Sequence, residues 1–217
     1  MTNVDEDRDR KDVLSDEEFN LMLTQARGND DEFLAHRDPA ILCMLRLTGK
    51  RREEVAGLAF NDVWIEGDYI HINFVLLKKH QDKPPERVRS IPLDDPLTKP
   101  ILDYMKYLKR KYKEMPKSFW PRVRPHFGHN VVYLDKGISG RAVYNVVRKY
   151  ADAAGVVAWP HLFRETAGAE EVKQDPSLYG VYKVANRIDV TEQTAWNYMR
   201  RHAMNVIRRE YKNGGVK

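Results

Sequence analysis

Cysteine is nearly missing from this sequence, with Cys43 the only one among 217 residues. A lone thiol excludes an internal disulfide, and its apolar neighbours indicate a packed side chain in a reducing compartment. No apolar stretch approaches the ~20 residues that cross a bilayer, and the acidic N-terminus is unlike a signal peptide. Cysteine and histidine do not occur at metal-ligand spacing, and no segment is repeated. These absences predict a soluble intracellular protein that holds no metal.

Acidic charge is concentrated in the first twenty residues. Residues 1–20 hold eight Asp or Glu against three Lys or Arg, a balance of −5, so in a chain of net charge +5 the remainder carries +10. Blocks of basic residues are the electrostatic footprint of a polyanion, although solvated helix surfaces also carry them. The charge of the remainder favours nucleic acid as the partner. The two basic blocks are Lys106, Lys109, Arg110, Lys111, Lys113, Lys117, Arg122 and Arg124, and Arg200, Arg201, Arg208, Arg209 and Lys212.

The N-terminal half predicts a short tail followed by helices. Residues 1–14 are polar and acidic, which predicts a disordered tail ahead of a single domain over 15–217. Ser15 with a glutamate three residues later has the pattern of a capping box and starts a helix. A second helix is expected from Asp38, as a cap followed by a proline, to Gly49, and a third over 52–59.

The rest of the chain predicts a hairpin and further helices. Residues 68–77 and 87–93 have the patterns of β-strands, and the proline-rich residues between them predict a turn. The prolines and glycines of 116–136 predict a loop. The fold class is therefore α+β, mostly helical, with a small antiparallel hairpin. The further helices are expected over 97–113, 139–155, 160–173, 175–188 and 191–212, the last capped by Thr191.

The segment PHLFRETAGAEE places His161 and Arg164 three residues apart. Residues at this spacing share a helix face, so the imidazole and the guanidinium can reach the same object. The arginine fork fits a phosphate or a carboxylate, and histidine can donate to the same group. The pair indicates an anion site, while the spacing alone also fits a core histidine beside a solvated arginine.

Four segments resemble, in order, the motifs of the tyrosine recombinases, the phage-integrase family. LRLTGKRREEVAGLAFNDV resembles the first arginine box, and Lys78-Lys79 ahead of RSIPL resembles the β-hairpin with its catalytic lysine. PHLFRETAG resembles the His-x-x-Arg box, and TAWNYMRRH places Tyr198 thirty-four residues after Arg164, where that family has its nucleophile. The resemblance covers residues 15–212. The residues that match the first box are Thr48, Gly49, Arg51, Glu54, Val55 and Leu58.

The resemblance implies the chemistry of DNA strand transfer. Arg51 and Arg164 would hold a DNA phosphate from two sides, because preorganised cationic donors stabilise the charge of the transition state. His161 would add a donor and assist proton transfer. Tyr198 would attack phosphorus and become a covalent 3′-phosphotyrosine, which conserves the bond energy, so that no ATP, metal or cofactor is needed.

The resemblance also implies a lysine that protonates the leaving 5′-oxygen as a general acid. Strand alternation places Lys78 on the face of Phe74 and Leu76 and points Lys79 the other way, which favours Lys78 and leaves Lys79 as the alternative. Glu54 is expected to be a structural partner of an arginine rather than a catalyst.

The sequence departs from the family pattern in three places. The usual Gly-His or Gly-Trp pair is missing, and the spacing puts Arg187 there, next to Asn186, either as a phosphate donor or as a surface arginine. Lys50 stands where leucine is common, which predicts an exposed or DNA-facing turn. The N-terminal helical domain of the family is absent before residue 15, as in a trimmed catalytic domain or a minimal recombinase, so phosphate contacts should dominate a salt-sensitive affinity.

The resemblance implies a site-specific recombinase or integrase that binds double-stranded DNA at a specific recombination site and self-associates there as a dimer or tetramer. The basic end RREYKNGGVK would then pack against a neighbouring protomer or its DNA. Two alternatives are relaxation of DNA in the manner of a type IB topoisomerase and a catalytically inactive DNA-binding protein. The implied location is cytoplasmic and nucleoid-associated, in a prokaryotic, archaeal or viral system.

Overall fold

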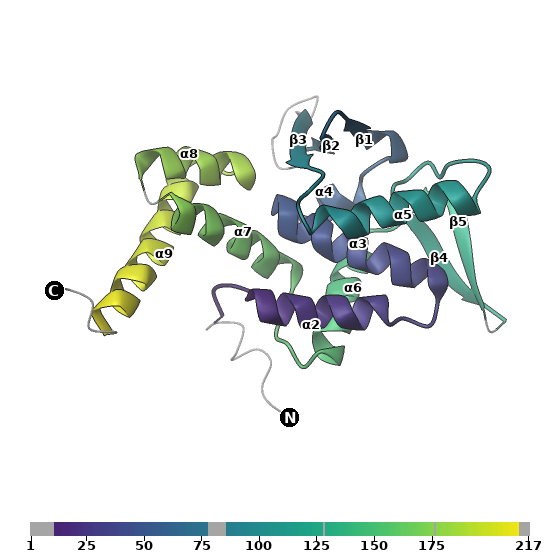
Figure 1. Ribbon diagram of the computed structural model, residues 1–217, viewed down its shortest axis with the longest axis horizontal. Coiled ribbons are helices and arrows are strands. Elements are labelled where there is room, and N and C mark those ends of the chain that lie inside the picture. The colour runs from purple at the N-terminus through teal and green to yellow at the C-terminus, as the bar shows by residue number, and fades with distance from the viewer. Residues whose placement is uncertain (1–10, 78–85, 128, 176, 213–217) are drawn as a thin grey trace.

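A computed structural model describes residues 11–77, 86–127, 129–175 and 177–212, with 203–212 described by their backbone (Figure 1). Helices and small antiparallel sheets build the molecule, so the predicted α+β, mostly helical class is confirmed. The helices are α2 (Asp16–Arg27), α3 (Glu32–Thr48), α4 (Arg52–Ala56), α5 (Thr98–Lys111), α6 (Gly140–Ala153), α7 (Pro160–Gln174), α8 (Leu178–Arg187) and α9 (Glu192–Lys212), with a 3-10 turn η1 (Phe60–Asp62). The strands are β1 (Val63–Glu66), β2 (Tyr69–Val75), β3 (Glu86–Pro92), β4 (Pro121–His126) and β5 (His129–Gly137).

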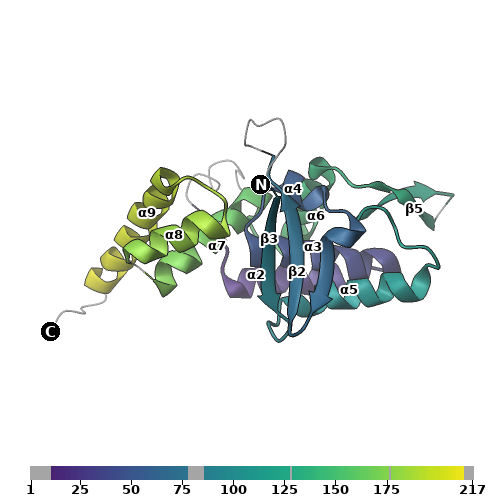
Figure 2. The ribbon, with the colours of Figure 1, turned by 90° about the horizontal axis from the view of Figure 1, so that it is seen from above.

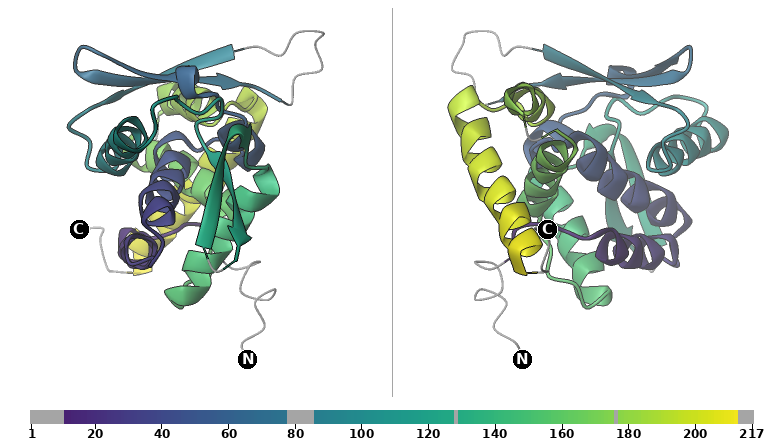
Figure 3. Two further views of the ribbon diagram at one scale, coloured as in Figure 1. Left: turned by 90° about the vertical axis from the view of Figure 1, so that its right-hand side faces the viewer. Right: turned by 60° about the vertical axis from the view of Figure 1, so that its left-hand side comes forward.

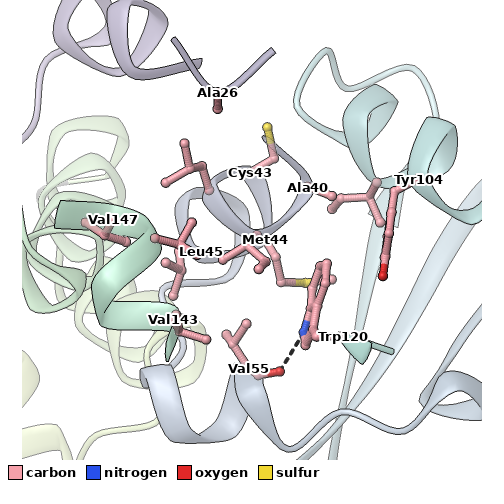
Figure 4. Packing of buried hydrophobic residues seen from close by; sticks show 14 of the residues in the cluster. Ala26, Ala40, Cys43, Met44, Leu45, Val55, Tyr104, Trp120, Val143 and Val147 are labelled. Carbon is pink, nitrogen blue, oxygen red and sulfur yellow. Dashed lines mark hydrogen bonds between the residues drawn. The ribbon is translucent and has the colours of Figure 1, made fainter. Parts of the chain in front are cut away.

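Helix α3 runs through the main core and contacts α2, α5, α6 and α7 (Figures 1 and 4). Cys43 on this helix is fully buried, and burial raises the pKa of its thiol to about 12, which confirms the packing role expected for it. Trp120 stacks on Tyr104 with 5.5 Å between ring centroids and donates its indole N–H to the Val55 carbonyl at 2.8 Å. This hydrogen bond holds α4, which carries part of the first arginine box, against the main core.

Helix α3 begins earlier than the sequence predicted. Asp31 is its N-cap, accepting a hydrogen bond from the backbone N–H three residues later at 2.9 Å, and Pro39 lies inside the helix. The predicted cap Asp38 is used elsewhere, because its carboxylate accepts from Arg37 at 2.8 Å and from the Tyr150 hydroxyl at 2.8 Å. A proline inside a helix removes one hydrogen bond, and the burial of nearly all the following side chains offsets that loss.

The predicted hairpin belongs to a three-stranded antiparallel sheet in the order β1-β2-β3, which lies across one side of the helices (Figure 3). Ile70, Ile72, Phe74 and Leu76 are buried at alternate positions, as predicted. Strand β1 was not predicted, because Val63 is its only buried residue and four residues with one buried position give no alternation.

The loop predicted over 116–136 is wrong, because most of this segment forms a second hairpin. Strand β4 pairs with β5 in a two-stranded sheet that stands apart from the other one (Figure 2). Proline is compatible with an edge strand when its N–H side faces away from the partner, so Pro121 and Pro125 do not prevent pairing. Composition alone predicted a loop because strands of this exposed ribbon show little burial alternation.

Helices α7, α8 and α9 enclose a second, smaller apolar cluster beside the main core (Figures 1 and 3). Helix α7 belongs to both clusters. Leu162 and Phe163 near its start pack into the main core, whereas Ala167 and Val172 further along pack into the second cluster. The His-x-x-Arg box therefore lies where the two clusters meet.

The described start of the chain contacts the domain. Leu14 is 2% exposed, and its N–H donates to the Thr166 hydroxyl on α7 at 2.8 Å. Lys11 lies 2.6 Å from Glu18 of α2. Residues 11–14, placed in the tail by composition, thus pack against α2 and α7.

Candidate active site

The first arginine box begins at the end of α3. Gly49 has a φ of 60°, a left-handed conformation that glycine adopts without strain. A Cβ at this position would lie 2.8 Å from Ile188 Cγ2 and 2.9 Å from Ala167 Cβ. The glycine therefore lets the turn between α3 and α4 approach the C-terminal helices.

Arg51 follows this turn and is oriented by Glu54. Its Nη1 donates to one carboxylate oxygen of Glu54 at 3.0 Å, and its backbone N–H donates to the other at 2.9 Å. Glu54 is 3% exposed, so the prediction that it is a structural partner of an arginine is confirmed. A guanidinium has five N–H donors, and the contact with Glu54 leaves donors of Arg51 for a ligand.

Arg164 on α7 is buried and is held by backbone carbonyls. Its Nη1 donates to the Gly49 carbonyl at 2.8 Å and its Nη2 to the Asp189 carbonyl at 3.5 Å. Burial, and then the charge of Arg51, lower the pKa of Arg164 to about 10, so the side chain stays cationic at neutral pH. Two neighbouring cations repel each other, and an anion between them relieves that repulsion.

Arg51, His161, Arg164 and Tyr198 line one open pocket of about 720 Å³ between the α3–α4 turn, α7 and α9. The fold brings Arg51 and Tyr198, which are far apart in the sequence, together with the His161 and Arg164 pair of α7. The alternative of a core histidine beside a solvated arginine is wrong, because His161 has a 63% exposed side chain and Arg164 is 3% exposed.

The hydroxyl of Tyr198 faces a carboxylate that the sequence analysis did not single out. It donates to Glu165 Oε1 at 2.9 Å, and Tyr198 is 8% exposed. Burial, and then the charge of Glu165, raise the pKa of Tyr198 above its ordinary value. Glu165 lies four residues after His161, and this helical spacing was the signal that could have identified it.

Tyr198 also packs closely against the backbone of α7. A Cβ at Gly168 would lie 2.8 Å from Tyr198 Cδ1 and 2.9 Å from Cε1. The absence of a side chain at Gly168 therefore sets how deeply the tyrosine ring sits in the pocket.

The prediction that Lys50 lies on an exposed or DNA-facing turn is wrong. Lys50 is 1% exposed, and its ammonium pairs with Asp189 and lies 5.1 Å from the centroid of the Phe74 ring. Burial, and then the charge of Arg89, lower its pKa. The lysine stem fills apolar space as a leucine would, and Asp189 supplies the counter-charge that a buried ammonium needs.

The remaining predicted residues lie apart from this pocket or outside the described part of the chain. Arg187 is on α8, where it contacts Glu171 at 2.9 Å and Glu170 at 3.2 Å, and it is not among the residues that line the pocket. Lys78 and Lys79 fall outside the described residues. The role predicted for each of these three stays a prediction.

The described residues contain no group of three or more histidine, cysteine or acidic side chains that could hold a metal ion. None of their helices is both long and apolar enough to cross a membrane.

Solved structures with a similar fold are tyrosine recombinases. The XerH site-specific recombinase bound to palindromic difH substrate has a TM-score of 0.67 at 13% identity, over 94% of this chain and 52% of that one. The XerA recombinase has a TM-score of 0.64 at 17% identity, over 94% of this chain and 64% of that one. A lambda integrase dimer bound to a COC′ core site has a TM-score of 0.52 at 13% identity, over 87% and 48%.

This chain thus spans about half to two thirds of the length of the recombinases it resembles. Its sequence matches no family profile and no curated protein. At these identities the likeness defines the architecture: the chain has the fold of the tyrosine recombinase catalytic domain.

Proposed function

We propose that this chain is a site-specific recombinase or integrase that cleaves and rejoins double-stranded DNA through a covalent 3′-phosphotyrosine. One observation carries the proposal: two arginines, a histidine and a tyrosine line the same pocket. Metal-free phosphoryl transfer by a tyrosine needs cations around the phosphate and a nucleophile within reach, and this set of side chains supplies both.

The arginines have distinct parts in the proposed reaction. Arg164 donates to two backbone carbonyls, which hold its positive charge in a fixed position at the pocket. Arg51 is more exposed and is oriented by Glu54, which suits bidentate contact with a non-bridging oxygen of an entering phosphate. Tyr198 would attack the phosphorus, and the hairpin lysine, Lys78 or Lys79, would protonate the departing 5′-oxygen.

Double-stranded DNA is the proposed partner. Arg200 and Arg201 follow Tyr198 on α9 and are exposed, and so are Arg122 and Arg124 on the β4–β5 ribbon. Cations of this kind bind the phosphate backbone with an affinity that falls steeply as salt rises. Self-association on a specific DNA site as a dimer or tetramer belongs to the same proposal, since recombination joins two duplexes.

The test is formation of a covalent protein–DNA adduct. Supercoiled plasmid, or a nicked duplex with a sequence that the chain binds, is incubated with the chain without metal or ATP. Adducts are then resolved under denaturing conditions. We expect an adduct with the wild type, none with Tyr198→Phe, and an unchanged yield with Tyr179→Phe, a control at an exposed tyrosine of α8. Relaxed plasmid without recombinant products would instead indicate topoisomerase-like activity.

An inactive DNA-binding protein is the second candidate. The observation that favours it is the pairing of Arg187 with Glu170 and Glu171, since the position that should supply a third phosphate donor is engaged elsewhere. DNA binding that is salt-sensitive, with no adduct from the wild type on either substrate, would establish this alternative.

A further inference from the structure

The carboxylate of Glu165 is the polar group in direct contact with the tyrosine hydroxyl. Oε1 accepts the hydrogen bond from Tyr198 at 2.9 Å and lies 3.0 Å from His161 Nε2, while Oε2 lies 3.3 Å from Arg201 Nη1. The side chain of Glu165 is 13% exposed. The reaction proposed above gives the departing 5′-oxygen a proton from the hairpin lysine. His161 has only a general part in proton transfer there, and the group that removes the proton of the attacking tyrosine is not assigned.

We propose that Glu165 is a further catalytic residue, the general base that accepts the proton of the Tyr198 hydroxyl. The inference rests on the proposed function, because it assigns a part in the same strand cleavage. His161 and Arg201 then act on this carboxylate as well, since both hold it in the position from which it reaches the tyrosine oxygen.

The proton and the electron pairs have defined destinations. As a lone pair of the tyrosine oxygen bonds to phosphorus, the O–H bond breaks and the proton moves to Glu165 Oε1. The bond from phosphorus to the 5′-oxygen breaks, and that oxygen keeps the electron pair and takes a proton from the hairpin lysine. In rejoining, the 5′-hydroxyl attacks phosphorus and gives its proton back to the hairpin lysine. The bond from phosphorus to the tyrosine oxygen breaks, and the protonated Glu165 returns its proton to that oxygen.

A base is needed because the tyrosine is not ionised in the free protein. Burial, and then Glu165, raise the pKa of Tyr198, so at neutral pH the attacking group is the neutral hydroxyl. Burial by itself would raise the pKa of Glu165, but hydrogen bonds from His161 and Tyr198 and the charge of Arg201 outweigh it and hold that pKa below its ordinary value. Glu165 is thus an ionised acceptor, and transfer becomes favourable as the tyrosine oxygen bonds to phosphorus and turns acidic.

Charged and titratable groups reach Glu165 from both helices that pack around it. Helix α7 contributes His161 and Arg164, and α9 contributes Arg201 and the tyrosine itself. His202 on α9 lies near the tyrosine, with 6.2 Å between the centroids of the two rings. Burial lowers the pKa of His202, and the negative charge of Glu165 opposes that shift only in part. Among these groups Glu165 makes the direct contact with the hydroxyl, and its position is that of a proton acceptor.

The variant that tests the assignment is Glu165→Gln, which keeps the size of the side chain and can accept a hydrogen bond but cannot take a proton. The matched control is Glu17→Gln at an exposed position of α2, which removes the same charge from a residue that does not line the pocket. The probe is a nicked duplex chosen from a random pool by its affinity for the wild-type chain. Single-turnover adduct formation is measured from pH 5.5 to 9.5, together with DNA affinity and melting temperature.

We expect Glu165→Gln to bind DNA at least as well as the wild type and to cleave about 100- to 10,000-fold more slowly at neutral pH, the range of general acid–base catalysis. Its rate should climb steadily towards alkaline pH, where hydroxide replaces the base. The wild-type rate should not show this climb, because the pKa of Glu165 lies below the whole measured range. Glu165→Asp retains a carboxylate and should recover part of the rate, which excludes misfolding as the cause.

A duplex with a 5′-bridging sulfur in place of oxygen separates base from acid, because a thiolate leaves without protonation. On this substrate the hairpin-lysine variant should recover its rate, and Glu165→Gln should remain slow. Cleavage by Glu165→Gln at the wild-type rate, or recovery on the sulfur substrate, would overturn the assignment. Faster cleavage would make Glu165 a restraint on the tyrosine instead. Failure of the wild type to form any adduct would refute the proposed function, and the base with it.

Discussion

The buried pair of Lys50 and Asp189 allows a quantitative test of how the C-terminal helices are attached. Asp189 is 4% exposed in its side chain, pairs with Lys50, and lies 3.5 Å from Arg87 and 3.8 Å from Arg89. Asp189→Asn keeps the side-chain shape and suits the left-handed backbone, φ 45°, that asparagine adopts readily. The change therefore removes a negative charge with little backbone strain.

The expected loss of unfolding free energy follows from the three cations, Lys50, Arg87 and Arg89, that would surround the neutral amide. Breaking a buried ion pair by removing one partner costs about 3–5 kcal/mol. We expect Asp189→Asn to lower the free energy of unfolding by about 3 kcal/mol, the lower end of this range. The pKa of Lys50 is already lowered, so the lysine can release its proton when its partner is removed. Lys50→Met should cost about 1–2 kcal/mol, because Asp189 then keeps two arginines nearby and the apolar stem is conserved.

The double variant distinguishes a charge pair from two independent packing effects. Lys50→Met combined with Asp189→Asn leaves an apolar side chain beside a neutral one, and replacing a buried pair as a unit is often neutral. We expect the double variant to lie within about 1 kcal/mol of Lys50→Met alone, a coupling of about 2–4 kcal/mol.

The assay is equilibrium unfolding in urea, which does not screen charge, followed by far-ultraviolet circular dichroism. The pairing would be refuted if the loss of unfolding free energy in the double variant equalled the sum of the two single-variant losses to within about 0.5 kcal/mol. Mutations at independent sites add in that way.

Two further predictions concern the pocket. Gly168→Ala would place a methyl group 2.8 Å from the Tyr198 ring, so adduct formation should fall about 100-fold while DNA affinity is kept, and equal cleavage by this variant would show that the ring is not seated on α7. The pKa of Glu165 lies below its ordinary 4.5 in the folded chain, so Glu165 contributes stability that is present above that value and lost as pH falls through the folded pKa. Urea unfolding at pH 7 and pH 3.5 should show the difference between wild type and Glu165→Gln shrinking at the lower pH, and a constant difference would contradict this.

Local signals in the sequence were sufficient where the physics is local. Ser15 and Glu18 form the capping box that was predicted, and Thr191 caps α9 through a 3.3 Å bond to the backbone N–H three residues later. The alternation in β2 also gave the correct buried face. In each case the interacting groups lie within a few residues of one another, so the pattern itself contains the interaction.

Features set by distant contacts could not be predicted in the same way. Asp38 has the local pattern of a helix cap, but its carboxylate accepts a hydrogen bond from Tyr150, which is more than a hundred residues away in the sequence. Lys50 resembled a surface lysine because its partner Asp189 is also remote. The ordered motifs did place Arg51 and Tyr198 in one pocket, since a family pattern encodes the tertiary arrangement that single-residue rules lack.

The boundary between the two apolar clusters would link anion binding in the pocket to the docking of the C-terminal helices. Arg164 reaches the Gly49 carbonyl across it, Lys50 pairs with Asp189, and Arg46 pairs with Glu170. An anion that enters beside Arg51 and Arg164 changes the electrostatic potential at these contacts. By reciprocity, whatever free energy the anion adds to the docking of α8 and α9, the docking of those helices adds to the affinity for the anion. Where that free energy is favourable, a bound phosphate and the seated tyrosine stabilise each other without any dedicated switch.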